Sequence, residues 1–238
     1  MDIAKSLTSN LVLITGHYGC GKTNLSINMA LDLARRVDGL PVTVVDLDIV
    51  NPYFRISDST RMLEEAGVTV VAPNFAGTTL DTPSLPPAIL NAVETAAAGK
   101  TISIIDVGGD PEGAMAIARF TRAISAVDYQ LVYIVNQKRL QTTHAQEATE
   151  LLAEIETNSG LRATHIVGNT HLKGETTAQH VVDAIPFTQG VCELTGLPLA
   201  FITSPTVVYD EVLHLLEGST PAAPPVYRVE TYVKTPWD

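Results

Sequence analysis

The residues best suited to chemistry are a run of glycines followed by a lysine and a threonine. Residues 16–23 read GHYGCGKT, a complete match to the pattern G-x-x-x-x-G-K-S/T, and we call them the phosphate loop. Glycines at this spacing let backbone N–H groups curl around a phosphate, and a following helix directs its positive end at the same charge. In this pattern the lysine reaches the terminal phosphates of a nucleotide and the hydroxyl binds Mg²⁺. The residues expected to bind the nucleotide here are Gly16, His17, Tyr18, Gly19, Cys20, Gly21, Lys22, Thr23 and Asn24.

Two further groups of residues supply carboxylates. Asp46 and Asp48 end an apolar run, and side chains two apart in an extended chain point the same way. One of them could hold a metal-bound water and the other an attacking water; the alternative is an acidic strand end with an ordinary turn. Asp106, before Gly108 and Gly109, suits a carboxylate near Mg²⁺, and glycines bring a backbone N–H close to a γ-phosphate. A simple turn would also use two glycines.

Short apolar runs, alternating with amphipathic segments, must position these residues. One run, residues 11–15, precedes the phosphate loop, and apolar residues repeat every four positions in a helix predicted over residues 23–37. Another helix is predicted from Thr143, with Gln146 as its capping partner. Runs that are apolar on both faces are typical of parallel strands covered by helices on each side. The sequence thus predicts a single α/β domain over residues 1–238, three-layered and doubly wound around a mainly parallel sheet. The other runs are residues 42–46, 68–72, 101–106, 131–136, 164–169 and 199–203.

The three groups, in this order, resemble the ParA/MinD-type ATPases of the SIMIBI class, which have the P-loop NTPase fold. The resemblance covers most of residues 10–216. The strings GHYGCGKT, DLDIVNPYFR and DVGGDPEGA resemble one subgroup of these nucleotide-binding proteins more than MinD or ParA themselves. The resemblance implies ATP and Mg²⁺ as cofactors, with Lys22 and Asp48 as the catalytic residues. In that role Asp48 positions the attacking water.

The same resemblance assigns the metal and the base. It implies that Asp46 and Asp106 lie around Mg²⁺ together with Thr23. Asn169, after a late apolar run, is similar to the asparagine that binds the amide edge of adenine. The segment around Pro205 would close the base pocket.

One position departs from the pattern of these proteins. Their loop carries an additional lysine that reaches across a dimer to the partner's phosphates, and here that position is His17. A histidine is shorter and largely neutral at pH 7, so it supplies less charge. Arg55 and Arg139 are candidates to replace the lysine, although a solvated or structural arginine is the plainer interpretation of each.

Composition argues against several classes of function. Fifteen Lys and Arg against 26 Asp and Glu give a net charge of −11, which would repel a nucleic-acid backbone. No apolar stretch approaches the roughly 18 to 20 residues of a membrane helix, and the N-terminal residues lack the apolar segment of a secretory signal. Two cysteines cannot build a disulfide framework; Cys20, at a helix start, is either a thiol of lowered pKa or an inert small residue. We therefore expect a reduced cytoplasmic protein that binds neither nucleic acid nor a membrane.

Two segments interrupt the alternation of strands and helices. Residues 73–87 contain four prolines and are predicted to form a lid or contact surface, with an ordinary surface connection as the alternative. The C-terminal tail, residues 218–238, is Pro-rich and then alternates in polarity. It is expected to add an edge strand, or to wrap the domain or a neighbouring subunit.

Together these observations predict a Mg²⁺-dependent ATP-binding protein that hydrolyses ATP slowly and acts as a nucleotide switch for a protein partner. A homodimer is expected from the resemblance. The alternative is an ATP-dependent small-molecule kinase, or a synthetase that forms an acyl phosphate on a small-molecule acceptor. A third possibility is a nucleotide-binding regulator with negligible turnover. The N-K-x-D code for guanine is absent, because neither Asn136 nor Asn169 is followed three residues later by aspartate, and this favours ATP over GTP.

Overall fold

The structure, a computed structural model, describes residues 1–36, 39–48, 56–72, 87–109, 111–218 and 223–233. Most of the predicted lid, residues 73–86, lies outside the described residues, and so does Arg55. No helix of the described part is both long enough and apolar enough to cross a membrane.

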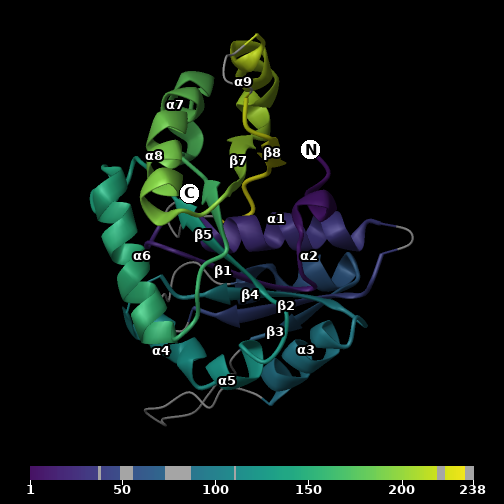
Figure 1. Ribbon diagram of the computed structural model, residues 1–238. Helices are drawn as coiled ribbons and strands as arrows, with labels where there is room; N and C mark the ends of the chain where they lie inside the picture. Colours follow the sequence, from purple (N-terminus) through teal and green to yellow (C-terminus); the bar gives the residue numbers. More distant parts are fainter. Residues whose placement is uncertain (37–38, 49–55, 73–86, 110, 219–222, 234–238) are drawn as a thin grey trace.

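An eight-stranded sheet forms the centre of the described chain, and every neighbouring pair of its strands is parallel (Figure 1). The order across the sheet is β3-β2-β4-β1-β5-β6-β7-β8. All seven predicted apolar runs are strands. The C-terminal tail adds β8 at one edge of the sheet, which was one of the two predictions for this segment. The strands are β1 (Leu11–Gly16), β2 (Val42–Leu47), β3 (Val68–Val71), β4 (Ile102–Val107), β5 (Gln130–Val135), β6 (His165–Gly168), β7 (Leu199–Pro205) and β8 (Val226–Val229).

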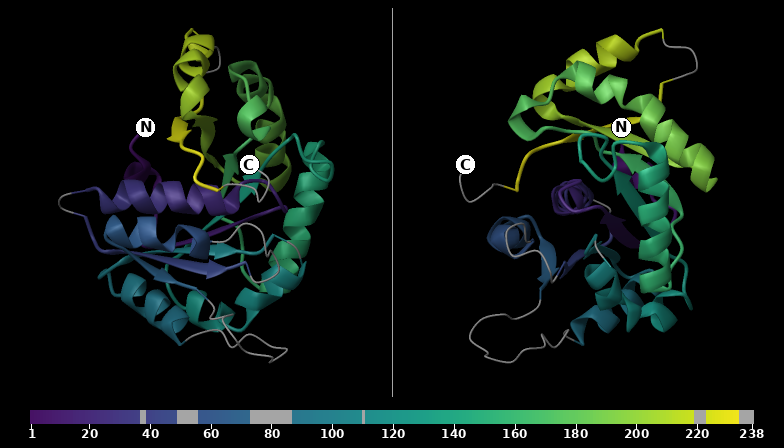
Figure 2. Two further views of the ribbon diagram at one scale, coloured as in Figure 1. Left: turned by 180° about the vertical axis from the view of Figure 1, so that it is seen from behind. Right: turned by 90° about the vertical axis from the view of Figure 1, so that its left-hand side faces the viewer.

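Helices cover both faces of the sheet, which confirms the three-layer architecture. Figure 2 shows α1 and α2 on one side of the sheet and α4 and α6 on the other. Alternate residues of β1 explain this: Leu11 and Leu13 pack into one hydrophobic cluster, while Val12 and Ile14 pack into a second. A third cluster joins α7 and α9 to β7 and β8. The helices are α1 (Lys22–Ala34), α2 (Thr60–Glu65), α3 (Ala88–Ala97), α4 (Pro111–Ala118), α5 (Thr121–Ile124), α6 (Ala145–Ser159), α7 (Ala178–Asp183), α8 (Ile185–Thr195) and α9 (Tyr209–Leu216).

The strand order determines where a ligand can bind. Strand β1 lies between β4 and β5, so the chain turns toward one edge of the sheet after β1 and toward the other after β4. In open α/β sheets the crevice at such a reversal, beyond the carboxyl ends of the strands, is the usual binding site. The phosphate loop follows β1 at this point. Asp46 of β2 and Asp106 of β4 are register partners at the same edge.

Two predicted helix boundaries differ from the structure. Helix α1 ends at Ala34 rather than at residue 37. The capping pair of α6 is shifted by one residue: the Glu147 carboxylate, not Gln146, accepts hydrogen bonds from the His144 N–H (3.0 Å) and the Thr143 hydroxyl (2.9 Å). A carboxylate accepts more strongly than an amide, and its charge is favoured at the positive end of a helix. These hydrogen bonds lower the pKa of Glu147.

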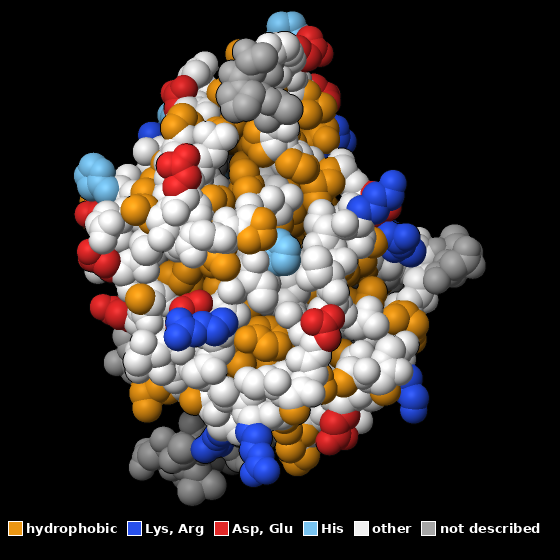
Figure 3. Space-filling model, in the orientation of Figure 1, with side chains coloured by type: hydrophobic (Ala, Val, Ile, Leu, Met, Phe, Trp, Pro, Cys, Tyr) orange, Lys and Arg blue, Asp and Glu red, His pale blue; other side chains and the backbone are white. Residues whose placement is uncertain are grey.

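The surface carries its charges in dispersed positions on the face drawn in Figure 3. Lysine and arginine side chains occur there singly or in small groups, between apolar and uncharged side chains.

Candidate functional site

Glycines allow the phosphate loop to adopt its shape. Gly16, Gly19 and Gly21 have φ values of 150°, 73° and 95°, in the region that favours glycine. A Cβ at Gly16 would collide with the Ile134 carbonyl oxygen of β5 and lie 2.9 Å from the Cys20 sulfur. The loop therefore packs directly onto the end of the neighbouring strand.

Lys22 and Asp48 lie together beneath this loop. Both side chains are buried, and Lys22 Nζ is 3.9 Å from Asp48 Oδ2. Gly108 and Gly109 of the β4–α4 turn approach the same pair: a Cβ at Gly109 would lie 2.8 Å from Lys22 Nζ, and one at Gly108 would lie 3.4 Å from Asp48 Oδ1. The structure thus brings the two predicted catalytic residues into contact with the predicted glycine turn.

Thr23 and Asp106 form the second buried pair. The Thr23 hydroxyl donates a hydrogen bond of 2.6 Å to Asp106 Oδ2. The other carboxylate oxygen, Oδ1, is buried and has no hydrogen-bond partner among the described residues. Burial raises the pKa of Asp106 well above its usual range; Asp48 and Asp46 act in the same direction, against the charge of Lys22.

Asp46 is used differently from the other two aspartates. Its Oδ1 accepts a hydrogen bond from the Asp48 N–H (3.2 Å) and its Oδ2 accepts one from the Ile56 N–H (3.1 Å). It therefore ties the end of β2 to the backbone at residue 56. This geometry favours a role for Asp46 in positioning Asp48.

The carboxylates fit a divalent cation that is completed by other ligands. Three buried aspartates against one buried lysine leave an excess of negative charge if all are ionised. The described residues contain no group of three or more His, Cys, Asp or Glu side chains placed to enclose a metal ion. Mg²⁺ is usually held by one or two protein oxygens, water and phosphate oxygens. Thr23 Oγ1 and the unpartnered Asp106 Oδ1 are suited to this arrangement.

A pocket with about 850 Å³ of empty space opens from these residues. We call the part bordered by Lys22, Thr23 and Asp48 its lysine end. The part bordered by Pro205 of β7 and by Val229, Thr231 and Val233 of the C-terminal tail is its tail end. The remaining described residues that line the pocket are Gly19, Gly21, Asn24, Arg139, Asn169, His171 and Lys173.

Asn169 connects the phosphate loop to the neighbouring strands. Its side-chain N–H donates a hydrogen bond of 2.6 Å to the carbonyl oxygen of Cys20, and its side-chain oxygen accepts one from the Thr203 hydroxyl. Gly21 is required beside it, because a Cβ there would collide with the amide. Asn169 thus holds the phosphate loop in place. Its predicted contact with adenine would have to use the second N–H or the second lone pair of the side-chain amide.

Comparisons with known proteins place the fold. No protein-family model matches the chain, and no curated protein matches it. Among solved structures, it is similar to FtsY from Mycoplasma mycoides (16% identity over 81% of this chain and 59% of that one, TM-score 0.52). It is also similar to the signal recognition particle receptor FtsY from Elizabethkingia anophelis in complex with GDP (18% identity over 83% of this chain and 58% of that one, TM-score 0.53). A third similar structure is the signal recognition particle 54 kDa protein from Aeropyrum pernix in complex with GDP (20% identity over 82% of this chain and 41% of that one, TM-score 0.51).

The chain has the P-loop NTPase fold. It spans less than two thirds of the length of each of these three proteins. At identities of 20% and below, the likeness concerns the fold alone.

Within this fold, four predicted loop residues do not line the pocket: Gly16, His17, Tyr18 and Cys20. The Cys20 side chain is fully buried in the core, and burial raises the pKa of its thiol. Of the two interpretations of Cys20, the thiol of lowered pKa is wrong, and the structure agrees with an inert small residue because the side chain packs into an apolar cluster. Tyr18 is 48% exposed. The half-buried His17 accepts a hydrogen bond at its carbonyl from the Cys20 N–H.

Two positively charged side chains, Arg139 and Lys173, and the His171 ring also line the pocket. The Arg139 guanidinium packs against Gly19, and its buried Nε has no hydrogen-bond partner among the described residues. The pKa of His171 is lowered to about 4 by burial, with the charges of Arg139 and Lys173 acting in the same direction. Sequence reasoning missed His171 and Lys173. Their only signal was proximity to Asn169 along the chain.

Proposed function

We propose that the protein is a Mg²⁺-dependent ATP hydrolase that works slowly and serves as a nucleotide switch for a partner protein. The observation that carries this proposal is the Thr23–Asp106 hydrogen bond beside the buried, unpartnered Asp106 Oδ1. Such an orphaned buried acceptor is costly unless another group completes it. A metal ion bound to a nucleotide's phosphates is the group that best matches its surroundings.

The chain's own residues have separable roles in this proposal. The backbone N–H groups of the phosphate loop and the Lys22 ammonium bind the β- and γ-phosphates. The Asp48 carboxylate orients a water for in-line attack on the γ-phosphorus, whose bond to the bridging oxygen breaks as ADP leaves. Thr23 and Asp106 would hold Mg²⁺, which supplies neutralisation of the phosphate charge. Asp46 fixes the backbone of Asp48.

The choice of ATP rests on the chemistry of the pocket. Guanine presents N–H donors on its Watson–Crick edge, which a carboxylate accepts best. Asp48 is the one carboxylate among the described pocket-lining residues, and it lies at the lysine end. The two similar structures that contain GDP therefore do not decide the base for this chain.

Phosphate release from ATP, measured with Mg²⁺ and with EDTA, tests the proposal. Slow release that requires Mg²⁺ and disappears in Thr23→Val would support it. The matched control is Thr157→Val, which removes a hydroxyl that only donates to the Ala153 carbonyl within α6. Release that depends on an added metabolite would instead identify the kinase or synthetase. Binding without any release would identify the regulator.

The homodimer is a separate part of the proposal. Its support is the resemblance to ParA/MinD-type ATPases and the position of His17, which is in the phosphate loop yet does not line the pocket of its own chain. If His17 faces a partner's phosphates, His17→Lys adds a charge there. We expect ATP-dependent dimerisation, seen by light scattering, to rise together with turnover at low protein concentration. If neither quantity changes, the cross-dimer chemistry does not apply to this chain.

We also expect the protein to act in the cytoplasm, in a reducing environment. Cys20 and Cys192 are both free thiols. Reduced thiols are typical of that compartment.

A further inference from the structure

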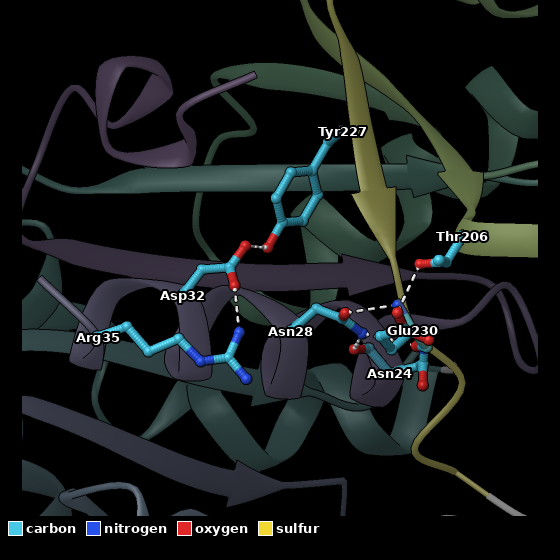
Figure 4. A network of polar contacts seen from close by, with 7 residues as sticks. All are labelled: Asn24, Asn28, Asp32, Arg35, Thr206, Tyr227 and Glu230. Atoms are coloured by element: carbon cyan, nitrogen blue, oxygen red, sulfur yellow. Dashed lines mark hydrogen bonds and ion pairs between the residues drawn. The ribbon is translucent and has the colours of Figure 1, made fainter. Parts of the chain in front are cut away.

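The C-terminal tail crosses the helix that begins at the phosphate loop. After β8 the chain leaves the sheet and passes over the first two turns of α1, where two asparagines bind its backbone (Figure 4). Asn28 binds Glu230 twice, donating to its carbonyl (2.9 Å) and accepting from its N–H (2.8 Å). Asn24 donates to the same carbonyl (2.8 Å) and accepts from the Tyr232 N–H (2.8 Å). The two amides thus replace the partner strand that the tail lacks here.

Side chains fix the tail on both sides of this crossing. The Tyr227 hydroxyl of β8 donates to Asp32 of α1 (2.8 Å), and the Thr206 hydroxyl donates to Glu230 Oε1 (2.7 Å). Tyr227 is buried and packs edge-on against Phe201. The tail is therefore anchored to α1, to the turn after β7 and to the core.

The anchored tail forms one side of the pocket. Val229, Thr231 and Val233 all line it together with the residues of the lysine end, and Pro205 of β7 is the register partner of Val229. Asn24 links the phosphate loop to the tail, because it directly follows Thr23 and its side chain also binds the tail. The tail end is mostly apolar, whereas the lysine end is charged.

We propose that residues 229–233 are the wall against which the nucleoside part of the bound nucleotide, its base and sugar, packs. This inference rests on the proposed nucleotide binding and adds the recognition element. A purine has flat apolar faces, which favour Val229, Val233 and Pro205 over water. The Asn24 and Asn28 amides act as positioning groups, because they hold the wall at a fixed distance from the phosphate loop.

The inference predicts different responses to two ligands that share their phosphates. MgATP contacts both ends of the pocket, whereas magnesium tripolyphosphate contacts only the lysine end. Asn28→Leu removes the double hydrogen bond to Glu230 without touching the phosphate loop. Asn158→Leu is the matched control, since the Asn158 amide donates only to the Glu154 carbonyl within α6. A second variant, Val233→Asp, places a charge on the wall, and a third is a chain that ends at Val229.

Calorimetry with both ligands decides the matter. We expect Asn28→Leu, Val233→Asp and the shortened chain each to weaken MgATP binding by about tenfold, with tripolyphosphate binding within about twofold of wild type. Equal losses for the two ligands would overturn the inference, because the tail would then act only through the shape of the phosphate loop. Unchanged MgATP binding in folded variants, checked by circular dichroism, would also overturn it. If the wild-type protein binds neither ligand, the proposed nucleotide binding itself fails and the wall has no function.

Discussion

The lysine end and the tail end of the pocket are built in different ways. At the lysine end the key side chains are buried, and they come from three short motifs at the ends of adjacent strands β1, β2 and β4. At the tail end the wall comes from residues some 200 positions away from the phosphate loop, and it is held by the amides of Asn24 and Asn28. The lysine end is built around adjacent strand ends, with side-chain hydrogen bonds such as Thr23–Asp106 added, whereas the tail end is held to α1 by hydrogen bonds from Asn24 and Asn28.

This difference suggests how phosphate binding and nucleoside binding each depend on the fold. Strand register places Asp46 and Asp106 side by side, and the glycines let the phosphate loop and the β4–α4 turn approach each other, so the sheet sets much of the geometry of the lysine end. The tail end can be weakened by single substitutions that leave the sheet intact. We therefore expect phosphate binding to be robust and nucleoside binding to be tunable.

Removing the charge at the lysine end should have the largest effect. Lys22→Ala leaves the phosphates of ATP without their buried cation and also leaves Asp48 without its ion-pair partner. We expect ATP binding to weaken by at least about 100-fold in calorimetry, because a charge-assisted contact is lost. Lys138→Ala, at an exposed lysine after β5, is the matched control. Wild-type affinity in Lys22→Ala would refute the assignment of the phosphate loop.

Asp48→Asn should separate binding from turnover at the same end. Orienting a water matters far more in the transition state than in the ground state, so we expect ATP affinity within a few-fold of wild type and about 100-fold slower phosphate release. Asp46→Asn is the informative comparison, because the Asp46 carboxylate accepts hydrogen bonds from the backbone N–H groups of Asp48 and Ile56. If Asp48→Asn turns over normally while Asp46→Asn is inactive, the two roles are reversed.

The sequence predicted the two ends unequally, for a physical reason. The lysine end follows from local motifs: Lys22, Thr23, Asp48 and Asp106 meet because parallel strands end at one edge. The seven apolar runs likewise predicted seven strands, because alternation with helices determines the order of elements. Asn24 was expected to contact the nucleotide, and its partnership with Glu230 could not be read from the sequence, since nothing local links positions 206 residues apart.

Cys20 shows a second limit of sequence reasoning. Its position at a helix start left two interpretations open, a thiol of lowered pKa and an inert small residue; the side chain enters the core and its thiol has a raised pKa, which agrees with the second. A motif specifies the path of the backbone. The direction of each side chain depends on what packs against it.

Substitution of Arg139 tests whether a second positive charge in the pocket lining contributes to ATP binding. Its guanidinium packs against Gly19 and lines the pocket, so Arg139→Ala removes a positive charge near the phosphate loop. We expect ATP affinity to fall by about tenfold, with partial recovery in Arg139→Lys. The control is Arg61→Ala, which breaks an exposed ion pair with Glu65 and should change nothing. Equal behaviour of the two alanine variants would make Arg139 a structural arginine.

The smallest effect concerns His171, whose ring lies against the same region. Its pKa is lowered from 6.5 to about 4 by burial and by the charges of Arg139 and Lys173. Between these two values the unfolded chain binds a proton that the folded chain does not, so the free energy of unfolding falls as the pH is lowered through this window. Denaturation in urea at a series of pH values should show a loss on the order of 1 kcal/mol that disappears in His171→Gln. His214→Gln, at an exposed histidine of α9, is the control.

The neutral His171 ring accepts a hydrogen bond from the Lys173 N–H at Nδ1 (3.4 Å), an acceptor that protonation would remove. An unchanged pH slope in His171→Gln would mean that the loop after β6 opens in acid and admits water to the ring, in which case this part of the pocket lining is less firmly held than the lysine end.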